Sequence, residues 1–218
     1  MASQVTTEHN RGSATIFKNP FLESLTRTSL TQNVIVYGSV IAFLIYYGTA
    51  VKGIPVLEFA FLFVFALFIW TLAEYLLHRY LFHWISENIL VQRFHFIMHG
   101  SHHLYPRDKE RLLMPPVPGL LMASLLFLLF YALFSIPGLG LYTWGFFPGF
   151  FLGYLLYSFV HRATHVSKPP KRLKHIWRHH SLHHYKYPDK AFGVSTSFWD
   201  RVFGTMPPRE DSGESKKH

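Results

Sequence analysis

Long apolar runs alternate with polar segments along this chain. A helix rises about 1.5 Å per residue, so roughly 20 residues cross the 30 Å hydrocarbon core of a bilayer. Four runs reach that length, at about residues 33–51, 55–77, 117–136 and 140–160. The last two share one stretch, Val117 to Val160, which has no charged residue or histidine and is broken by Ile136-Pro137-Gly138-Leu139-Gly140. The pattern predicts an all-α integral membrane protein whose four transmembrane helices form two hairpins.

The segments between these runs predict the domain plan. Residues 1–17 and 208–218 are polar tails, and the first shows no signal peptide. Residues 18–30 (KNPFLESLTRTSL) have the pattern of a short amphipathic helix in the membrane interface. Residues 78–116 and 161–207 are expected to form a helical cap, which makes 18–207 the functional domain.

Positive charge predicts the orientation. Lysines and arginines are frequent before the first run, between the second and third, and after the fourth, whereas the opposite side has only Lys52. Because short cytoplasmic loops are enriched in these residues, both termini and the central loop are expected to be cytoplasmic. Nucleic-acid binding, the alternative suggested by a pI of 9.8, is disfavoured because the basic residues flank membrane runs.

Three features of the composition bear on the class of protein. Half of the residues are hydrophobic and 22 are phenylalanine, which excludes a disordered chain. The sequence has no cysteine, which excludes disulfide scaffolds, iron–sulfur clusters and cysteine-ligated zinc fingers. It has 15 histidines, and 13 of them fall between positions 78 and 184, on the predicted cytoplasmic side.

Ten of these histidines form four spaced groups, H-x4-H, H-x2-HH, H-x3-H and H-x2-HH: His78 and His83; His99, His102 and His103; His161 and His165; His180, His183 and His184. Residues three and four apart share a helix face, so each H-x2-HH group can aim three imidazoles at one point. The pair five apart diverges on a straight helix. It converges only if the helix ends between its members, and otherwise each serves a different metal.

Ten neutral imidazoles on one membrane face need donors or metals for their lone pairs. Imidazole suits iron, zinc, copper and nickel, and ten ligands exceed the four of a structural zinc site. The number fits two metal ions with five or six ligands each. We interpret the other five histidines differently: His9 and His218 as solvated, and His95, His175 and His179 as basic surface residues or hydrogen-bond donors behind the ligands.

Four further side chains are candidates for supporting roles. Glu74 lies one helical turn before His78 and either orients a ligand or pairs with Arg79 or another basic residue. Asp108 and Asp189 are weaker candidates in cytoplasmic segments. Tyr157 lies one turn before His161 and either points into the site or anchors the helix at the membrane interface.

The histidine pattern and the four runs resemble the fatty acid hydroxylase/sterol desaturase superfamily. Two stretches resemble the fatty acid 2-hydroxylases that act on sphingolipid acyl chains. One is HGSHH at 99–103, followed by Pro106, Asp108, Arg111-Leu112 and Met114-Pro115-Pro116, and the other is SFWDRVFGT at 197–205. The resemblance covers roughly residues 18–207.

This resemblance implies O2-dependent 2-hydroxylation of a long fatty acyl chain, free or within a ceramide, at a dimetal centre. Iron is favoured because zinc is redox-inert, although zinc is also described in this family. Some members carry a cytochrome b5 domain with a His-Pro-Gly-Gly motif, which this sequence lacks. A separate electron donor is therefore expected, such as cytochrome b5 or a ferredoxin with its reductase.

Two alternatives remain open at this stage. A sterol or carotenoid hydroxylase or desaturase would keep the metal site and change the substrate. A membrane metal transporter or sensor would need polar residues inside the runs, which Val117 to Val160 does not offer. The expected location is the endoplasmic reticulum membrane or a bacterial inner membrane, depending on the source.

Overall fold

The computed structural model describes residues 12–84 and 86–208, and the regular elements among these residues are all helices. Four of the helical stretches are long and apolar enough to cross a membrane: Leu30–Val51, Val56–Phe82, Pro116–Ser135 and Gly140–Val166. The prediction of an all-α protein with four such helices is confirmed. The interpretation of His9 and His218 as solvated concerns positions outside the described residues.

The first long helix begins earlier than predicted, and the amphipathic helix expected over residues 18–30 is wrong in extent. Only α1 (Pro20–Ser24) forms there, where the Asn19 side chain accepts hydrogen bonds from the first turn. The chain then leaves the helix and restarts at α2 (Leu30–Tyr46), because the Ser29 hydroxyl caps the N–H of Gln32. The π-helix η1 (Tyr47–Val51) completes this stretch.

The other long helices are α3 (Val56–Leu76), α6 (Pro116–Ser135) and α7 (Thr143–Val166). The fourth helix therefore runs past the predicted end at 160 and carries two of the ten grouped histidines within its last turns. A 3₁₀ turn, η4 (Gly140–Tyr142), precedes it. The apolar run ends at Val160, but the polar residues that follow continue the same helix, so hydropathy alone marks its end too early.

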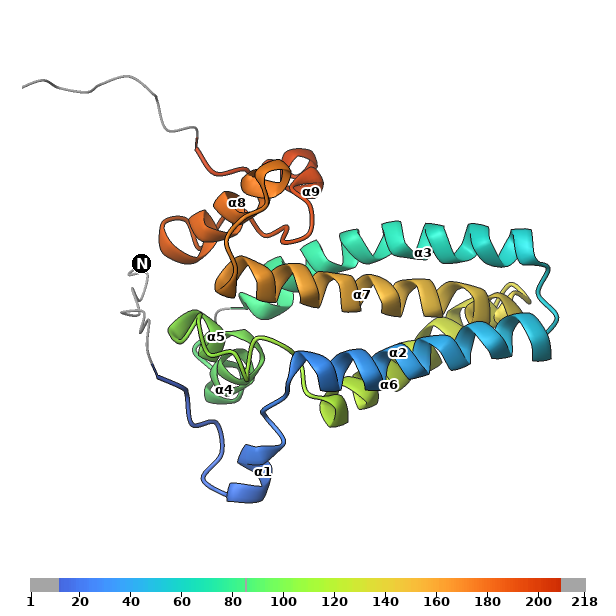
Figure 1. The fold of residues 1–218 in the computed structure, drawn as a ribbon, viewed down its shortest axis with the longest axis horizontal. Coiled ribbons are helices and arrows are strands. Elements are labelled where there is room, and N and C mark those ends of the chain that lie inside the picture. The colour runs from blue at the N-terminus through green and yellow to red at the C-terminus, as the bar shows by residue number, and fades with distance from the viewer. Residues whose placement is uncertain (1–11, 85, 209–218) are drawn as a thin grey trace, which may run out of the picture.

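Helix α7 lies at the centre of the bundle, as Figure 1 shows, between α3 and α2, and it also packs against α6. Helices α2 and α3 therefore pack mainly on α7, although they follow each other in the sequence. In α7, 61% of the most apolar stretch is buried, against 11% in α6. The outward faces of α2, α3 and α6 expose large apolar side chains, such as Ile35, Phe61 and Leu125. A surface of this kind suits contact with lipid.

Glycines allow α7 to approach α3 closely. Gly145, Gly149 and Gly153 are four residues apart and share one helix face. A Cβ atom at Gly149 would collide with the backbone carbonyl of Phe63, and one at Gly153 would collide with the side chain of Trp70. Small residues at such spacing are typical of closely packed helices in membranes.

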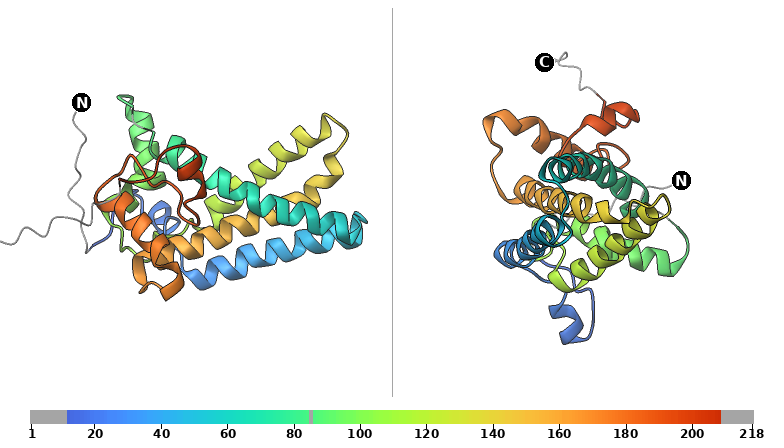
Figure 2. Two further views of the ribbon diagram at one scale, coloured as in Figure 1. Left: turned by 90° about the horizontal axis from the view of Figure 1, so that it is seen from above. Right: turned by 90° about the vertical axis from the view of Figure 1, so that its right-hand side faces the viewer.

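The remaining helices gather at one end of the bundle, on the side where α3 and α7 end (Figures 1 and 2). They are α4 (Ile89–His95), α5 (Ser101–Leu104), α8 (Lys174–Tyr185) and α9 (Phe198–Val202), with the short turns η3 (Phe96–Gly100) and η5 (Lys171–Leu173). We call this assembly the cap. All ten grouped histidines lie in the cap or where α3 and α7 enter it.

We expect Gly149→Ala to destabilise the bundle, because the added methyl group meets main chain that cannot move aside. Overpacking of this kind costs roughly 1–3 kcal/mol, which lowers the melting temperature of a chain of this size by about 2–12 °C. Gly38→Ala is the matched control, since a Cβ at Gly38 meets open space. Thermal unfolding in detergent measures both variants, and equal melting temperatures would contradict the close packing of α3 and α7.

Candidate metal centre

The ten grouped histidines form two sets of five. The first histidine set is His78, His83, His99, His103 and His183, and the second histidine set is His102, His161, His165, His180 and His184. Within each set, one ring nitrogen from every member lies within 4.8 Å of the others. Each set draws on three or four separate segments of the chain, so only the folded cap brings it together.

The spacing within each set fits a single metal ion. Neighbouring Nε2 atoms are 2.9–3.0 Å apart in the first set and 2.7–3.1 Å apart in the second. Two ligand atoms that are each about 2.1 Å from one ion and at a right angle to each other lie roughly 3.0 Å apart. Nε2 lone pairs that face one another at this distance repel unless a cation or protons lie between them. The donor set and its geometry therefore fit a metal ion in each set.

A π-helix solves the spacing problem of the first pair. His78 lies in η2 (Leu77–Phe82), which continues α3, and the backbone N–H of His83 donates to the carbonyl of His78 over 3.2 Å. An i to i+5 bond of this kind places residues five apart one above the other. Both rings therefore join the first set, and their predicted divergence on a straight helix does not occur.

Each H-x2-HH group is divided between the two sets, which corrects the expectation that its three imidazoles meet at one point. The residues four apart stay together, as His99 with His103 and His180 with His184. The remaining histidines, His102 and His183, join the opposite set. Residues i+3 and i+4 point about 100° apart around a helix axis, so one helix can serve two neighbouring centres.

Burial keeps the imidazoles of the cap neutral. Burial, together with the neighbouring His183 and His95, lowers the pKa of His83 to about 3, and burial lowers that of His183 to about 4. Burial likewise lowers the pKa of His99, His102 and His184 well below the ordinary value for histidine. Neutral rings keep the lone pair that a metal ion requires.

Two backbone carbonyls, two residues apart in the chain, fix the orientation of rings in the first set. The Nδ1–H of His183 donates to the carbonyl of Lys190 over 2.7 Å, and that of His78 donates to the carbonyl of Phe192 over 2.5 Å. With Nδ1 protonated, Nε2 carries the free lone pair. Ala191, between the two carbonyls, has a φ of 58°, a left-handed conformation that is rare for alanine.

The loop that supplies these carbonyls is held by two buried acidic side chains, Asp200 and Glu74. Asp200 accepts hydrogen bonds from the N–H groups of Phe192 and Gly193, both over 2.9 Å. His179 and Thr205 also donate to it, and although burial alone would raise the pKa of Asp200, these bonds hold it below its usual value. Sequence reasoning missed Asp200, although it lies in the quoted 197–205 stretch.

Glu74 takes neither of the roles considered for it. It accepts hydrogen bonds from the N–H groups of Val194 and Ser195, over 2.7 and 2.8 Å, and from the Ser195 hydroxyl. Arg79, its expected partner, donates to Tyr75 instead. Glu74 therefore ties α3 to the same loop as Asp200, and it supports the first set through the backbone.

The other three candidates for supporting roles differ in whether they contact the histidines. Asp108 pairs with Arg111 and not with a histidine of either set, and Asp189 is exposed. Tyr157 stacks in parallel on His161, with ring centroids 5.6 Å apart. It therefore contacts the site, which is the first of its two expected roles.

The three histidines outside the sets also differ from one another. His175 is exposed, as a surface residue should be, and His95 is half-buried near His83. His179 is buried and donates to Asp200, so it acts as a donor behind the ligands.

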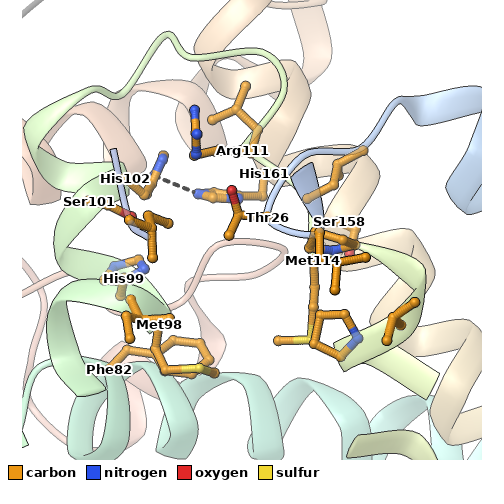
Figure 3. Close-up of a pocket in the computed structure, with 18 of the residues that line it drawn as sticks. Thr26, Phe82, Met98, His99, Ser101, His102, Arg111, Met114, Ser158 and His161 are labelled. Carbon is orange, nitrogen blue, oxygen red and sulfur yellow. Dashed lines mark hydrogen bonds between the residues drawn. The ribbon is translucent and has the colours of Figure 1, made fainter. Parts of the chain in front are cut away.

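An apolar cavity of about 430 Å³ reaches both sets, as Figure 3 shows. His99, His102 and His161 line its inner side. Val117 and Leu121 also line it and are exposed on the outer face of α6, so the cavity reaches the surface that suits lipid. A smaller polar pocket of about 90 Å³ reaches His165 and His180 separately.

Comparison with known proteins decides the family. A family model described as fatty acid hydroxylase matches residues 63–205, which contain all ten grouped histidines. The chain belongs to the fatty acid hydroxylase family. The resemblance inferred from the histidine groups and the two flanking stretches is confirmed.

Relatives of this chain have names that specify a substrate. The ceramide very long chain fatty acid hydroxylase SCS7 of Saccharomyces cerevisiae is 39% identical over 200 residues, which cover 90% of this chain and 50% of the relative. The dihydroceramide fatty acyl 2-hydroxylase FAH2 of Arabidopsis thaliana is 32% identical, over 88% of this chain and 79% of the relative. The chain thus spans about half the length of the yeast relative and more of the plant one.

A solved structure shares the fold of this chain. It is described as full length scs7p with only the hydroxylase domain visible. The TM-score is 0.80 at 37% identity, and the match covers 91% of this chain and 74% of the other. The four long helices and the cap therefore form an arrangement that the two proteins have in common.

We expect Asp200→Asn to loosen the loop at 190–195, since the amide turns an N–H donor toward buried N–H groups. Leaving buried donors unpaired costs roughly 2 kcal/mol or more, or about 4–8 °C in melting temperature. Bound metal should also fall, because the loop orients His78 and His183. Asp189→Asn, at an exposed position, is the control for melting temperature and metal content, and equal loss in both variants would contradict this role of Asp200.

Proposed function

We propose that this chain catalyses O2-dependent hydroxylation at C2 of a long fatty acyl chain, free or within a ceramide. The observation that supports this most directly is the meeting of two five-histidine sets with one apolar cavity that opens toward lipid. The names of the relatives, which specify ceramide and 2-hydroxylation, agree with it.

We propose that the first histidine set holds one metal ion and the second histidine set holds the other. Redox-active ions in these positions would supply the activation of O2 that breaking an unactivated C–H bond requires. Iron is the favoured metal, because zinc has no accessible second oxidation state. Zinc can still occupy an all-imidazole site, so the donor set alone does not select against it.

The protein fixes the orientation of the imidazole rings and limits the access of water to them. Buried, neutral imidazoles face the centre with their Nε2 atoms, and the Lys190 and Phe192 carbonyls keep two of them in the required tautomer. The Phe192 ring lies against His78, His83 and His183, with centroids 5.6–5.8 Å apart. This apolar cover limits access of water to the first set, which protects a reactive centre from side reactions.

The cavity suits an acyl chain in size and polarity. Its volume of about 430 Å³ lies in the range of ligand pockets, and aliphatic and aromatic side chains provide most of its walls. A chain that enters beside Val117 and Leu121 would point its reacting end at His99, His102 and His161. The family and this cavity favour an enzyme over a metal transporter.

The reaction needs an electron donor and a membrane. We propose that a cytochrome b5, or a ferredoxin with its reductase, delivers the electrons. The distribution of lysine and arginine supports a cytoplasmic cap and cytoplasmic termini. The membrane would be the endoplasmic reticulum in a eukaryote or the inner membrane in a bacterium.

We expect purified protein to contain about two metal ions per chain, one for each set, by elemental analysis. His180→Ala removes a ligand of the second set alone and should lower the content toward one. His83→Ala should do the same for the first set. A wild-type protein without bound metal would contradict the dimetal site.

We expect cells that express the protein to accumulate 2-hydroxy acyl lipids, measured by mass spectrometry. His180→Ala should abolish them, since losing one ligand disrupts the second set. The exposed His175→Ala is the matched control and should retain the product. Hydroxylated sterols or carotenoids in their place would show that the proposed substrate is wrong.

A further inference from the structure

Arg111 is the one lysine or arginine among the described residues that line the apolar cavity. Its side chain is only 5% exposed. A charged side chain in such a place needs partners for all of its N–H groups, because unpaired donors away from water are costly. How the five N–H groups of Arg111 are satisfied therefore indicates what the cavity is built to bind.

The outer edge of the guanidinium is occupied. One terminal nitrogen donates to Asp108 over 2.9 Å and to the hydroxyl of Ser13, and the other donates to Glu23. Although burial alone would raise the pKa of Glu23, the N–H groups of Phe17 and Ile16, together with Arg111, hold it below its usual value. Glu23 is therefore ionised, and the two terminal nitrogens of Arg111 are engaged by Glu23, Asp108 and Ser13.

One N–H group of Arg111, the one on Nε, has none of these partners. Nε of Arg111 is buried and has no hydrogen-bond partner among the described residues. An unmade hydrogen bond from a charged donor is unfavourable enough that such groups are normally paired. Because Arg111 lines the cavity, a small movement of its side chain would bring this donor to an acceptor that arrives with the ligand.

Arg111 lies at the end of the cavity where the chemistry is expected. It lines the same cavity as His102 and His161, and so does Leu112, the next residue. Figure 3 shows Arg111 toward the same end as His102 and His161, whereas Phe82 and Met98 lie toward the other.

Two other residues on the cavity wall have a buried polar atom without a partner among the described residues, and both are less suitable. His102, through its Nδ1, is one of them, but it belongs to the second histidine set. The hydroxyl of Tyr154 is buried without a partner among the described residues. Tyr154 precedes His161 by seven residues on α7, which places it roughly 10 Å farther along the helix. The C1 oxygen of an acyl chain lies two bonds from C2, so its donor must be beside the reacting carbon.

We propose that the Nε–H of Arg111 donates a hydrogen bond to the carbonyl oxygen at C1 of the acyl chain and so holds C2 at the histidine sets. Arg111 is then a positioning residue that determines where the chain is hydroxylated. The inference rests on the proposed function, since it assigns the anchor of that same substrate.

The charge around Arg111 favours a neutral carbonyl. In the ion-pair network around Arg111, Glu23, Asp108 and Glu110 contribute three negative charges against the two positive charges of Arg111 and Arg27. A further carboxylate would meet net repulsion, whereas an amide or ester oxygen accepts the hydrogen bond without it. We therefore expect an N-acyl amide to react in preference to the free acid of the same chain.

The test is the position of the new hydroxyl group. Purified holoenzyme with its electron donor is given ceramide of defined acyl length, and the products are separated by position with mass spectrometry. Arg111→Lys keeps a positive charge for Glu23 and Asp108 but removes the Nε donor. We expect kcat/KM to fall about 10- to 100-fold and C3 or later positions to appear beside C2.

Two matched variants separate positioning from stability. Glu23→Gln weakens the same ion pair and leaves Nε in place, so its products should remain at C2 even if the rate falls. Arg27→Lys makes the same substitution at an exposed arginine of the N-terminal segment and should behave as wild type. Ceramide binding to holoenzyme without its electron donor, measured by thermal stabilisation, should weaken about tenfold in Arg111→Lys alone.

The outcomes are distinct. Products only at C2 in Arg111→Lys, or scattered products in both Arg111→Lys and Glu23→Gln, would overturn the anchor. Faster reaction of the free acid than of ceramide in wild type would overturn the preference for a neutral carbonyl. A wild-type protein that hydroxylates no acyl lipid would instead refute the proposed function.

Discussion

The close approach of ten imidazole nitrogens is the constraint on which the rest of the structure depends. Nε2 atoms that lie about 3 Å apart in a buried space present lone pairs to one another, and this arrangement is unfavourable unless cations separate them. A protein with this arrangement must hold each ring in its orientation by contacts on the side away from Nε2. The carboxylates of Glu74 and Asp200 serve this purpose, because they fix the loop whose carbonyls orient His78 and His183.

The membrane helices provide the rigid base for this arrangement. Helix α7 is enclosed by α2, α3 and α6, and glycines let it lie close to α3, so the ends of α3 and α7 enter the cap at a fixed separation. These ends carry His78 and His161. The cavity lies beside the same ends, where an acyl chain leaving the bilayer would meet the histidines without crossing water.

Both the apolar runs and the histidine groups were readable in the sequence, because hydropathy and helical spacing are local properties. The division of each H-x2-HH group between two sets was not readable, since it depends on where the second centre lies. The π-helix at His78 and His83 was also hidden, because no residue type specifies a π turn. Asp200 escaped notice because its role is to hold a loop, and the histidines that it supports are distant in sequence.

The sequence by itself therefore determined the class of this protein: helices that suit a membrane, ten histidines at ligand spacing, and the family that these share. The tertiary structure decided which five histidines share a centre, which carboxylates hold them, and which cavity meets them. The physical reason is that ligand type and helix periodicity are encoded by neighbours along the chain. Convergence on a point depends on contacts between residues as far apart as His83 and His183, which only the packed cap creates.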